Sequence, residues 1–188
     1  DGSTDNSQEF IDKIDHEKVT KIFQKNKGVA AARNTGIRHS CGTYILPLDA
    51  DDKIAPEYIE KAFHKLEAEP NLGIVYCEVE VFGKFNKKWD LPAFSLKGYL
   101  TANNSIVCSG LFRKADWTQI GGYCENYKLF PEDIDVWLSV LELGREVYKI
   151  PQILFYYRQQ DDYSRTKMIY FKIITNFIYI IMFLSHLD

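Results

Sequence analysis

Residues 42–52 read GTYILPLDADD, an apolar run that ends in a group of acidic side chains. Residues 44–48 have the pattern of a buried strand, and the acids follow at its carboxyl end. Residues 56–69, PEYIEKAFHKLEAE, then place apolar side chains on one face of a helix whose first position is Pro56. A strand that delivers acids and leads into a helix predicts an α/β fold, in which ligands bind beyond the carboxyl ends of the strands.

The sequence on either side continues the alternation of strands and helices. Toward the N-terminus we expect a helix from Asn6 to Asp15, capped by one of residues 3–5, and a short strand at residues 19–23. The alternation predicts a three-layer α/β fold with a mostly parallel mixed sheet. We expect three further helices, one that begins at Gly28 and two that cover residues 114–120 and 132–143. The remaining expected strands are at 73–82, 106–112, 147–150 and 153–157, and residues 83–104 are expected to be irregular.

The acids of the loop are Asp49, Asp51 and Asp52. Carboxylates this close repel one another, and burial raises the cost of their charge. A hard divalent cation such as Mg²⁺ or Mn²⁺ would remove that cost and bridge to phosphate oxygens. A solvated acidic turn before a helix is an equally good interpretation of the cluster alone. The nucleophile motif of a phosphatase is a more distant alternative, because Lys53 follows where small or hydroxyl residues belong.

A second acidic group, Glu132, Asp133 and Asp135, stands at the expected start of a helix. Acids at this position commonly serve as caps that the helix dipole favours. A carboxylate aimed from a helix start into the same cleft is also a suitable general base. In GVAAARNTGI, small residues around Arg33 allow close backbone approach, so this arginine could hold a nucleotide by charge or by stacking.

Composition excludes several other classes of protein. The 188 residues fit one domain, and the net charge of -3 argues against a nucleic-acid partner, which requires a basic face. The cysteines show no metal-type spacing, so we expect free thiols in a reducing compartment. These cysteines are Cys41, Cys77, Cys108 and Cys124.

Taken in order, the motifs resemble those of family 2 glycosyltransferases, which have the nucleotide-binding GT-A fold. The match covers nearly the whole chain up to about residue 166, and the order and spacing of the segments make it specific. In the family a buried strand precedes DGSTDNS, so the resemblance implies that this first strand is missing from the chain. The matching segments are DGSTDNS at 1–7, GVAAARNTGI at 28–37, GTYILPLDADD at 42–52, LFRKADWTQIGGY at 111–123, PEDIDVWLSVLELG at 131–144 and FYYR at 155–158.

The resemblance also implies roles by position. Asp133, the second acid of its pair, matches the catalytic base. Asp51 matches the ligand of a Mn²⁺ or Mg²⁺ ion, although the family motif leaves open whether Asp51 or Asp52 holds it. The expected nucleotide contacts are Asp1 to the base, Arg33 near the base and Asp49 near the ribose, and the expected cleft residues are Glu132 and Arg158.

The implied reaction is an inverting transfer of a sugar from a nucleoside diphosphate sugar, with a UDP-sugar as the expected donor. The acceptor would be a saccharide or a lipid-linked saccharide in the synthesis of a bacterial cell-surface polysaccharide. Two alternatives remain at this point: a nucleotidyltransferase that makes sugar nucleotides, and a non-catalytic module that binds them. The residues do not identify the donor sugar, the acceptor or the linkage.

The expected domain organisation is a catalytic domain at residues 1–166 and an amphipathic helix at residues 167–188. Apolar residues form one stripe along this helix, but Lys172 and Asn176 interrupt the apolar run along the sequence, and its unbroken stretch is far shorter than the ~20 residues of a membrane-spanning helix. We expect the stripe to pack on its own domain or in a homodimer. A peripheral membrane contact is the alternative, disfavoured by the few cationic residues on the polar face. The expected location is the cytoplasm, or the inner face of the membrane if the acceptor is a lipid.

Overall fold

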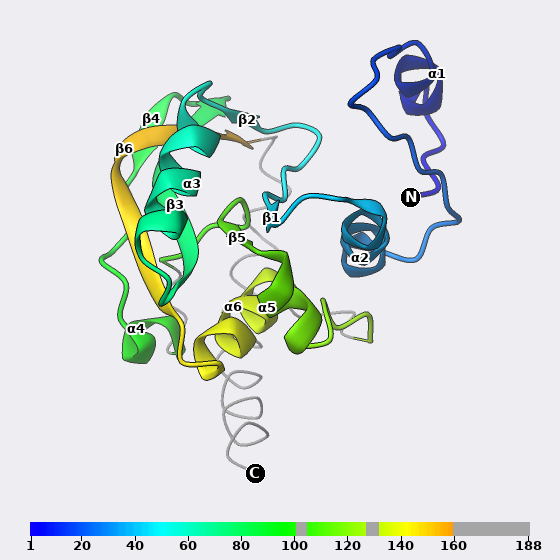
Figure 1. The fold of residues 1–188 in the computed structure, drawn as a ribbon. Coiled ribbons are helices and arrows are strands. Elements are labelled where there is room, and N and C mark those ends of the chain that lie inside the picture. Colours follow the sequence, from blue (N-terminus) through cyan, green and yellow to red (C-terminus); the bar gives the residue numbers. More distant parts are fainter. Residues whose placement is uncertain (101–104, 127–131, 160–188) are drawn as a thin grey trace.

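The computed structural model describes residues 1–100, 105–126 and 132–159 (Figure 1). These residues form an α/β fold around one sheet, with the strand order β1-β5-β3-β6-β2 and β4 paired to β3. The described strands are β1 (Tyr44–Ile45), β2 (Lys53–Ile54), β3 (Leu72–Gly83), β4 (Lys87–Trp89), β5 (Leu111–Arg113) and β6 (Glu146–Gln159). The described helices are α1 (Ser7–Asp12), α2 (Val29–His39), α3 (Tyr58–Ala68), α4 (Leu96–Leu100), α5 (Lys114–Gln119) and α6 (Glu132–Glu142).

The sheet is mixed, and only part of it is parallel. The long strands β3 and β6 run parallel, whereas the β1–β5, β5–β3, β4–β3 and β2–β6 pairs are antiparallel. Between β3 and β6 the chain passes through α4, α5 and α6, which gives it the length that a parallel crossover needs. The expected α/β class is therefore confirmed, while the expected mostly parallel sheet is corrected to a mixed, partly parallel one in the described residues.

The two faces of the sheet carry different helices. Phe112 of β5 packs edge-to-face on Trp137 of α6, with ring centroids 5.4 Å apart and an interplanar angle of 77°. The next residue, Arg113, donates a 2.6 Å hydrogen bond to the backbone carbonyl of Leu66 in α3. Because successive side chains of a strand point to opposite faces, α3 and α6 lie on opposite sides of the sheet. This gives the three layers that the sequence predicts.

The core lies along β3, where residues 74–77 are completely buried. Helix α3 buries Tyr58, Ala62 and Leu66 on one face, whereas Ile59 and Phe63, which the apolar pattern groups with Leu66, are exposed. Tyr58 donates a 2.7 Å hydrogen bond to the carbonyl of Ser109, so its buried hydroxyl is satisfied.

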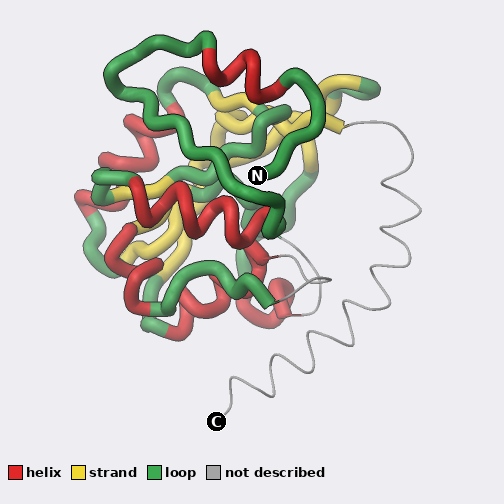
Figure 2. Tube along the Cα trace, turned by 90° about the vertical axis from the view of Figure 1, so that its right-hand side faces the viewer, coloured by secondary structure: helices red, strands yellow, loops and turns green. Residues whose placement is uncertain are grey.

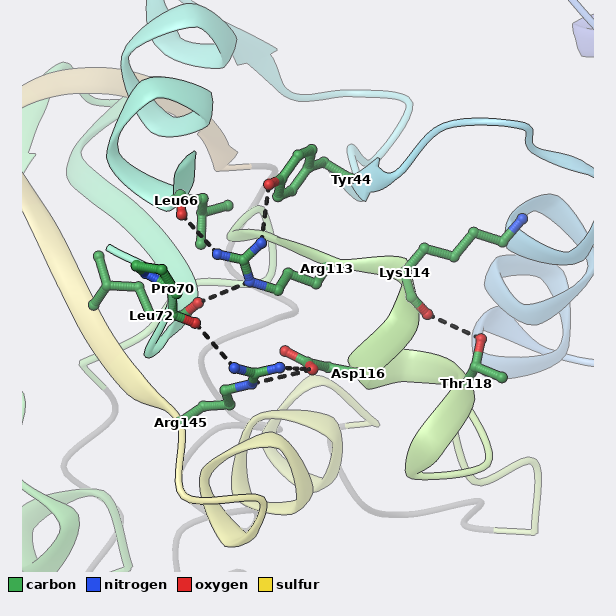
Figure 3. Close-up of polar contacts among 9 residues, drawn as sticks. All are labelled: Tyr44, Leu66, Pro70, Leu72, Arg113, Lys114, Asp116, Thr118 and Arg145. Carbon is green, nitrogen blue, oxygen red and sulfur yellow. Dashed lines mark hydrogen bonds and ion pairs between the residues drawn. The ribbon is translucent and has the colours of Figure 1, made fainter. Parts of the chain in front are cut away.

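Two arginines join the ends of these elements (Figure 3). Arg113 contacts the carbonyls of Leu66 and Leu72, which closes the connection between α3 and β3. Arg145, just after α6, donates hydrogen bonds of 3.1 and 2.7 Å to the buried carboxylate of Asp116 in α5. These contacts fix the end of α6 against α5, and they thereby fix the direction in which the start of α6 points.

The N-terminal part of the chain differs most from expectation. Residues 19–23 form no strand, because alternation alone does not create one without a neighbour to share its hydrogen bonds, and Val19 and Phe23 are exposed. The first helix covers only Ser7–Asp12, has no buried residue and begins where Asp5 accepts a hydrogen bond from the backbone of Ser7. In Figure 1 this segment lies beyond α2, apart from the strands of the sheet, and in Figure 2 it runs in front of them.

Other predicted boundaries also change. The strands expected at 44–48 and 106–112 shrink to β1 and β5, because only these residues form ladder bonds. The two strands expected near the C-terminus are one strand, β6, whose register with β3 shifts around the exposed Pro151, a residue that cannot donate to the ladder. The segment expected to be irregular contains β4 and α4.

The predicted helix at residues 167–188 lies outside the described residues. Within the described ranges, no helix combines the length and apolar character needed to cross a membrane. All of the cysteines are described and none is in a disulfide, as the sequence predicts.

Candidate functional site

The acidic loop follows β1 and is closed by a hydrogen bond of 3.1 Å from the amide of Asp52 to the carbonyl of Asp49. The end of β6 holds the loop in place. Arg158 donates its backbone N–H to the carboxylate of Asp52 at 2.8 Å and its Nε to the carbonyl of Asp51 at 3.0 Å. The guanidinium of Arg158 also lies 4.6 Å from the centroid of the Phe82 ring, which orients it. Arg158 therefore positions the acids, a more specific role than the cleft residue that the sequence suggested.

Asp52 is the most buried acid of this loop, with 8% of its surface exposed. Its Oδ2 atom is buried and has no hydrogen-bond partner among the described residues. Burial raises the pKa of Asp52 to about 6, and the neighbouring charges of Asp51 and Asp49 add to this effect, while the bond from Arg158 opposes it. A buried carboxylate with one open oxygen is costly unless a proton or a cation neutralises it.

Arg33 of α2 joins the loop to the start of α6. Its Nη2 donates to Asp49 Oδ1 at 2.8 Å, and its Nη1 contacts the carboxylate of Glu132. The guanidinium lies 5.7 Å from the centroid of the Tyr123 ring. Burial would lower the pKa of Arg33, but Asp49, Tyr123 and Glu132 together raise it, so the side chain is a permanent cation. The predicted residues Arg33, Asp49 and Glu132 are thus in direct contact.

Asn34, which the sequence analysis did not single out, anchors α2 in the position that this contact requires. Its buried amide donates to the carbonyl of Tyr123 and accepts from the Tyr123 amide, both at 2.8 Å. Gly122, with φ at +87°, brings the chain so close that an added Cβ would meet Asn34 Oδ1 at 2.9 Å. The Gly121-Gly122 pair is the local sequence signal for this close approach, although glycines there are equally typical of a helix end.

Asp133 is the second residue of α6, and its carboxylate accepts a hydrogen bond of 3.0 Å from the amide of Ile134. Burial raises the pKa of Asp133 to about 6, and the charge of Glu132 raises it further, against the lowering effect of Arg33. A carboxyl group whose pKa approaches neutrality is better suited to exchange protons than an ordinary aspartate.

Cys108 is the residue of this site that sequence reasoning missed. Its sulfur and one carboxylate oxygen each from Asp49 and Asp52 all lie within 4.8 Å of one another. Burial raises the pKa of the thiol to about 12, and the charges of Asp49 and Asp133 contribute, so the thiol is close to both acidic groups. A scattered cysteine gives no motif, and more than fifty residues separate it from the acids, so no local pattern could have revealed it.

The acids of the loop fit a divalent cation. They present oxygen ligands, which Mg²⁺ and Mn²⁺ prefer, and the open oxygen of Asp52 offers a ligand position in the described structure. Within the described residues, the group that the geometry brings together is Asp49, Asp52 and Cys108. This group includes Asp52 rather than Asp51, the acid that the resemblance favoured as the ligand, and the identity of the ligand stays a prediction.

Asp1 belongs to a different group of contacts. Its carboxylate accepts hydrogen bonds from the Gln24 side chain at 2.9 Å and from the backbone amides of Lys27 and Gly28 at 2.9 and 3.0 Å. It thus fixes the turn that begins α2. Its expected contact with a nucleotide base stays a prediction.

A groove of about 350 Å³ runs between α2 and β1, next to the arginine bridge. Its walls include Arg33, Ile37, Ile45 and Pro47. Of the predicted site residues only Arg33 lines it. The groove is thus mainly an apolar neighbour of the acidic site.

The chain is similar in fold to solved structures of the GT-A type. S. aureus TarS 1-349 in complex with UDP-GlcNAc superposes with a TM-score of 0.66 at 15% identity, over 85% of this chain and 48% of that one. The mannosyltransferase PcManGT from Pyrobaculum calidifontis, in complex with GDP-Man and Mn²⁺, gives a TM-score of 0.52 at 16% identity, over 76% and 39%. These identities establish the likeness of the fold.

A family model described as Glycosyl transferase family 2 matches residues 1–135. The chain belongs to this family. Its relatives include the chondroitin synthase of Escherichia coli, 28% identical over 77% of this chain and 22% of the relative. They also include the amylovoran biosynthesis glycosyltransferase AmsE of Erwinia amylovora, 28% identical over 74% of the chain and 54% of the relative. The chain thus spans about half or less of the length of these relatives.

Proposed function

We propose that this chain carries the donor-binding and catalytic residues of an inverting glycosyltransferase. The enzyme transfers a sugar from a nucleoside diphosphate sugar, with a UDP-sugar as the preferred donor, to a saccharide or lipid-linked acceptor. The catalytic domain comprises residues 1–166. The protein acts in the cytoplasm or at the inner face of the membrane, where such donors and acceptors meet.

One observation carries this proposal: Arg33 bonds to Asp49 and to Glu132 at the same time. Asp49 belongs to the loop that offers oxygen ligands, and Glu132 is the neighbour of Asp133. The bridge therefore brings the two acidic groups to one site, although they are more than eighty residues apart in the sequence. Neither a solvated turn nor a set of helix caps explains why the two groups share a buried cation.

Asp133 is the proposed general base. It would accept the proton of the acceptor hydroxyl while that oxygen attacks the anomeric carbon. A single displacement inverts the anomeric centre and needs no glycosyl-enzyme intermediate, so one carboxylate suffices. The pKa of about 6 leaves Asp133 mostly ionised at neutral pH and still basic enough to take a proton.

The loop acids are proposed to hold a Mn²⁺ or Mg²⁺ ion, with Asp52 and Asp51 as candidate ligands and Asp49 near the ribose. When bound, the cation would offset negative charge on the diphosphate leaving group. Arg33 and Asp1 are proposed nucleotide contacts, and Arg158 positions the loop. The Mn²⁺ and GDP-Man of the mannosyltransferase and the UDP-GlcNAc of TarS are consistent with this arrangement.

The relatives support a role in polysaccharide synthesis. They include a chondroitin synthase, an amylovoran biosynthesis glycosyltransferase and the putative glycosyltransferase EpsE of Bacillus subtilis. We infer that the acceptor is a growing saccharide chain, free or on a lipid.

The test begins with thermal unfolding of the full-length protein in the presence of UDP or GDP, each with and without Mn²⁺. The proposal expects a rise in melting temperature that requires both nucleotide and cation. A panel of UDP- and GDP-sugars is then assayed for donor hydrolysis and transfer, and the anomeric configuration of the product is read by NMR. The absence of cation-dependent nucleotide binding would contradict a transferase, and a retained configuration would contradict inversion.

A further inference from the structure

Cys108 brings a sulfur atom to the cation site, and the family resemblance implies no sulfur ligand there. We propose that Cys108 is a sulfur ligand of this site, so that Asp49, Asp52 and Cys108 bind a thiophilic divalent cation such as Co²⁺, Zn²⁺ or Cd²⁺. The inference rests on the cation site of the proposed function and specifies which ions that site takes.

The geometry supports three ligands from two distant segments. The thiol and one oxygen of each carboxylate lie within 4.8 Å of one another, a spread that one ion can draw together by small side-chain movements. Asp52 is 8% exposed, and its Oδ2 has no partner in the described part of the chain. The cluster therefore contains a buried carboxylate oxygen whose hydrogen-bonding capacity the protein does not meet, which an acidic turn in solvent would not have.

The thiol lies among negative charges that a cation would offset. Its sulfur is 3.7 Å from Ser109 Oγ, the range of a weak hydrogen bond that involves sulfur. Burial raises the pKa of the thiol to about 12, and the charges of Asp49 and Asp133 add to this effect, so both carboxylates are close to the sulfur. A coordinated cation reverses this effect, because a thiol bound to a metal loses its proton.

Binding of the cation displaces the thiol proton. The S–H bond of Cys108 breaks, a sulfur–metal bond forms, and the proton passes to solvent without any change in oxidation state. Thiolate ligands select Zn²⁺ and similar ions, whereas Mg²⁺ and Mn²⁺ prefer oxygen. A site with two carboxylates and one thiol can therefore bind either kind of ion, and the sulfur decides the preference between them.

Cobalt titration of the full-length protein, with its thiols kept reduced and no nucleotide present, tests the proposal. Co²⁺ bound by a thiolate gives a sulfur-to-cobalt charge-transfer band in the near ultraviolet, which oxygen ligands do not produce. We expect the band in the natural protein and in Cys124→Ser, a matched change at another partly buried cysteine. We expect it to be lost in Cys108→Ser.

Affinity and proton release provide the second readout. Loss of a second-shell partner typically lowers metal affinity ~10–100-fold, so loss of a direct ligand in Cys108→Ser should weaken Co²⁺ or Zn²⁺ binding at least about tenfold. Mn²⁺ affinity should change little, because Mn²⁺ does not depend on sulfur. The natural protein should also release about one proton more per cobalt ion than Cys108→Ser does, because a coordinated thiol loses its proton.

Three results would overturn the inference: no cobalt binding, cobalt binding without the charge-transfer band, or a band that survives in Cys108→Ser. Each is distinguishable from failure of the proposed function, which is measured separately as Mn²⁺-dependent binding of nucleoside diphosphate. A protein that binds UDP with Mn²⁺ but shows no sulfur band would keep the transferase proposal and lose this one.

Discussion

The loop after β1 and the start of α6 each contain a carboxyl group whose pKa burial raises, but they hold it differently. Asp52 accepts one hydrogen bond from the backbone of Arg158, and its second oxygen has no partner among the described residues. Asp133 accepts a bond from its neighbour Ile134 and lies beside Glu132, whose carboxylate is bound to Arg33. In both cases burial is the main reason that the pKa rises to about 6.

The difference shows how one physical effect can serve two purposes. Burial makes either carboxylate costly at neutral pH, so each gains from neutralisation. The open oxygen of Asp52, next to two other candidate ligands, favours neutralisation by a cation. Asp133 lies near a permanent cation already, and its pKa suits the temporary acceptance of a proton. The comparison thus supports the proposed division, with cation binding at the loop and proton transfer at the helix.

The largest effect is expected for Asp133→Asn, which removes the proposed base. The rate of transfer by the full-length protein should fall by ~10²–10⁴-fold, the usual contribution of a general base. Donor affinity, measured by calorimetry, should remain close to that of the natural protein. A rate within a factor of a few of the natural one would assign the base to another group and remove the distinction between the two regions.

Asp51→Ala tests cation binding by the loop, whereas Asp133→Asn tests proton transfer. The gain in UDP affinity that Mn²⁺ provides should fall by at least about tenfold, because even second-shell changes lower metal affinity ~10–100-fold. Calorimetry with and without Mn²⁺ measures this gain. Asp90→Ala, which removes an exposed acid outside the loop, is the matched control. Unchanged Mn²⁺-dependent affinity in Asp51→Ala would leave Asp52 and Asp49 as the ligands.

Much of the fold was predictable because its signals are local. The continuous apolar run of β3 and the acid-rich start and Gly144 end of α6 predicted these elements almost to the residue. The strand expected at residues 19–23 was wrong because a strand depends on a partner that local alternation does not supply. The polar sequence Lys87–Trp89 gave no strand signal, yet it pairs with β3 as β4.

The candidate site was predictable only in part, because local motifs do not show which distant segments come into contact. The acids stand in two compact motifs, and Arg33 has a recognisable setting of small residues. Their direct contact, the anchoring of α2 by Asn34 and the approach of Cys108 to Asp49 all join segments far apart in the chain. Such contacts depend on the packing of helices against the sheet, which no single motif encodes.

Asp52→Asn should increase stability while it weakens the cation site. The ordinary pKa of 3.8 rises to about 6 in the folded protein, so this group contributes most to stability at low pH. That contribution is lost as the pH rises through about 6. The amide keeps the oxygen that Arg158 bonds, and we expect a gain of up to about 1–2 kcal/mol at pH 7 without divalent cations, since one pKa unit corresponds to about 1.4 kcal/mol.

Urea unfolding at pH 7 and pH 4 measures this gain, which should disappear at the lower pH. Asp116→Asn is the control, because Asp116 is buried to a similar degree but is bound to Arg145. Breaking a buried ion pair typically costs ~3–5 kcal/mol, so this second change should destabilise the protein. A loss of stability at pH 7 in both variants would mean that the charge of Asp52 is compensated within the protein.

The smallest effect concerns the pH dependence of transfer, and it tests whether Arg33 couples the two regions. The rate should fall as the pH decreases through about 6, because Asp133 must be ionised to accept a proton. Arg33 lowers the pKa of Asp133, although less than burial raises it. Arg33→Met should therefore move the acid limb of the kcat profile to higher pH.

Saturating donor and Mn²⁺ keep this measurement separate from the proposed role of Arg33 in nucleotide binding. Arg38→Met is the matched control, because Arg38 lies on the same helix, is exposed and contacts Glu125 at 3.9 Å and Thr35 at 3.3 Å, away from the two acidic groups. Its acid limb should stay in place. If the limb of Arg33→Met also stays in place, then the bridge between Asp49 and Glu132 is structural, and the loop and the helix start act as independent acids.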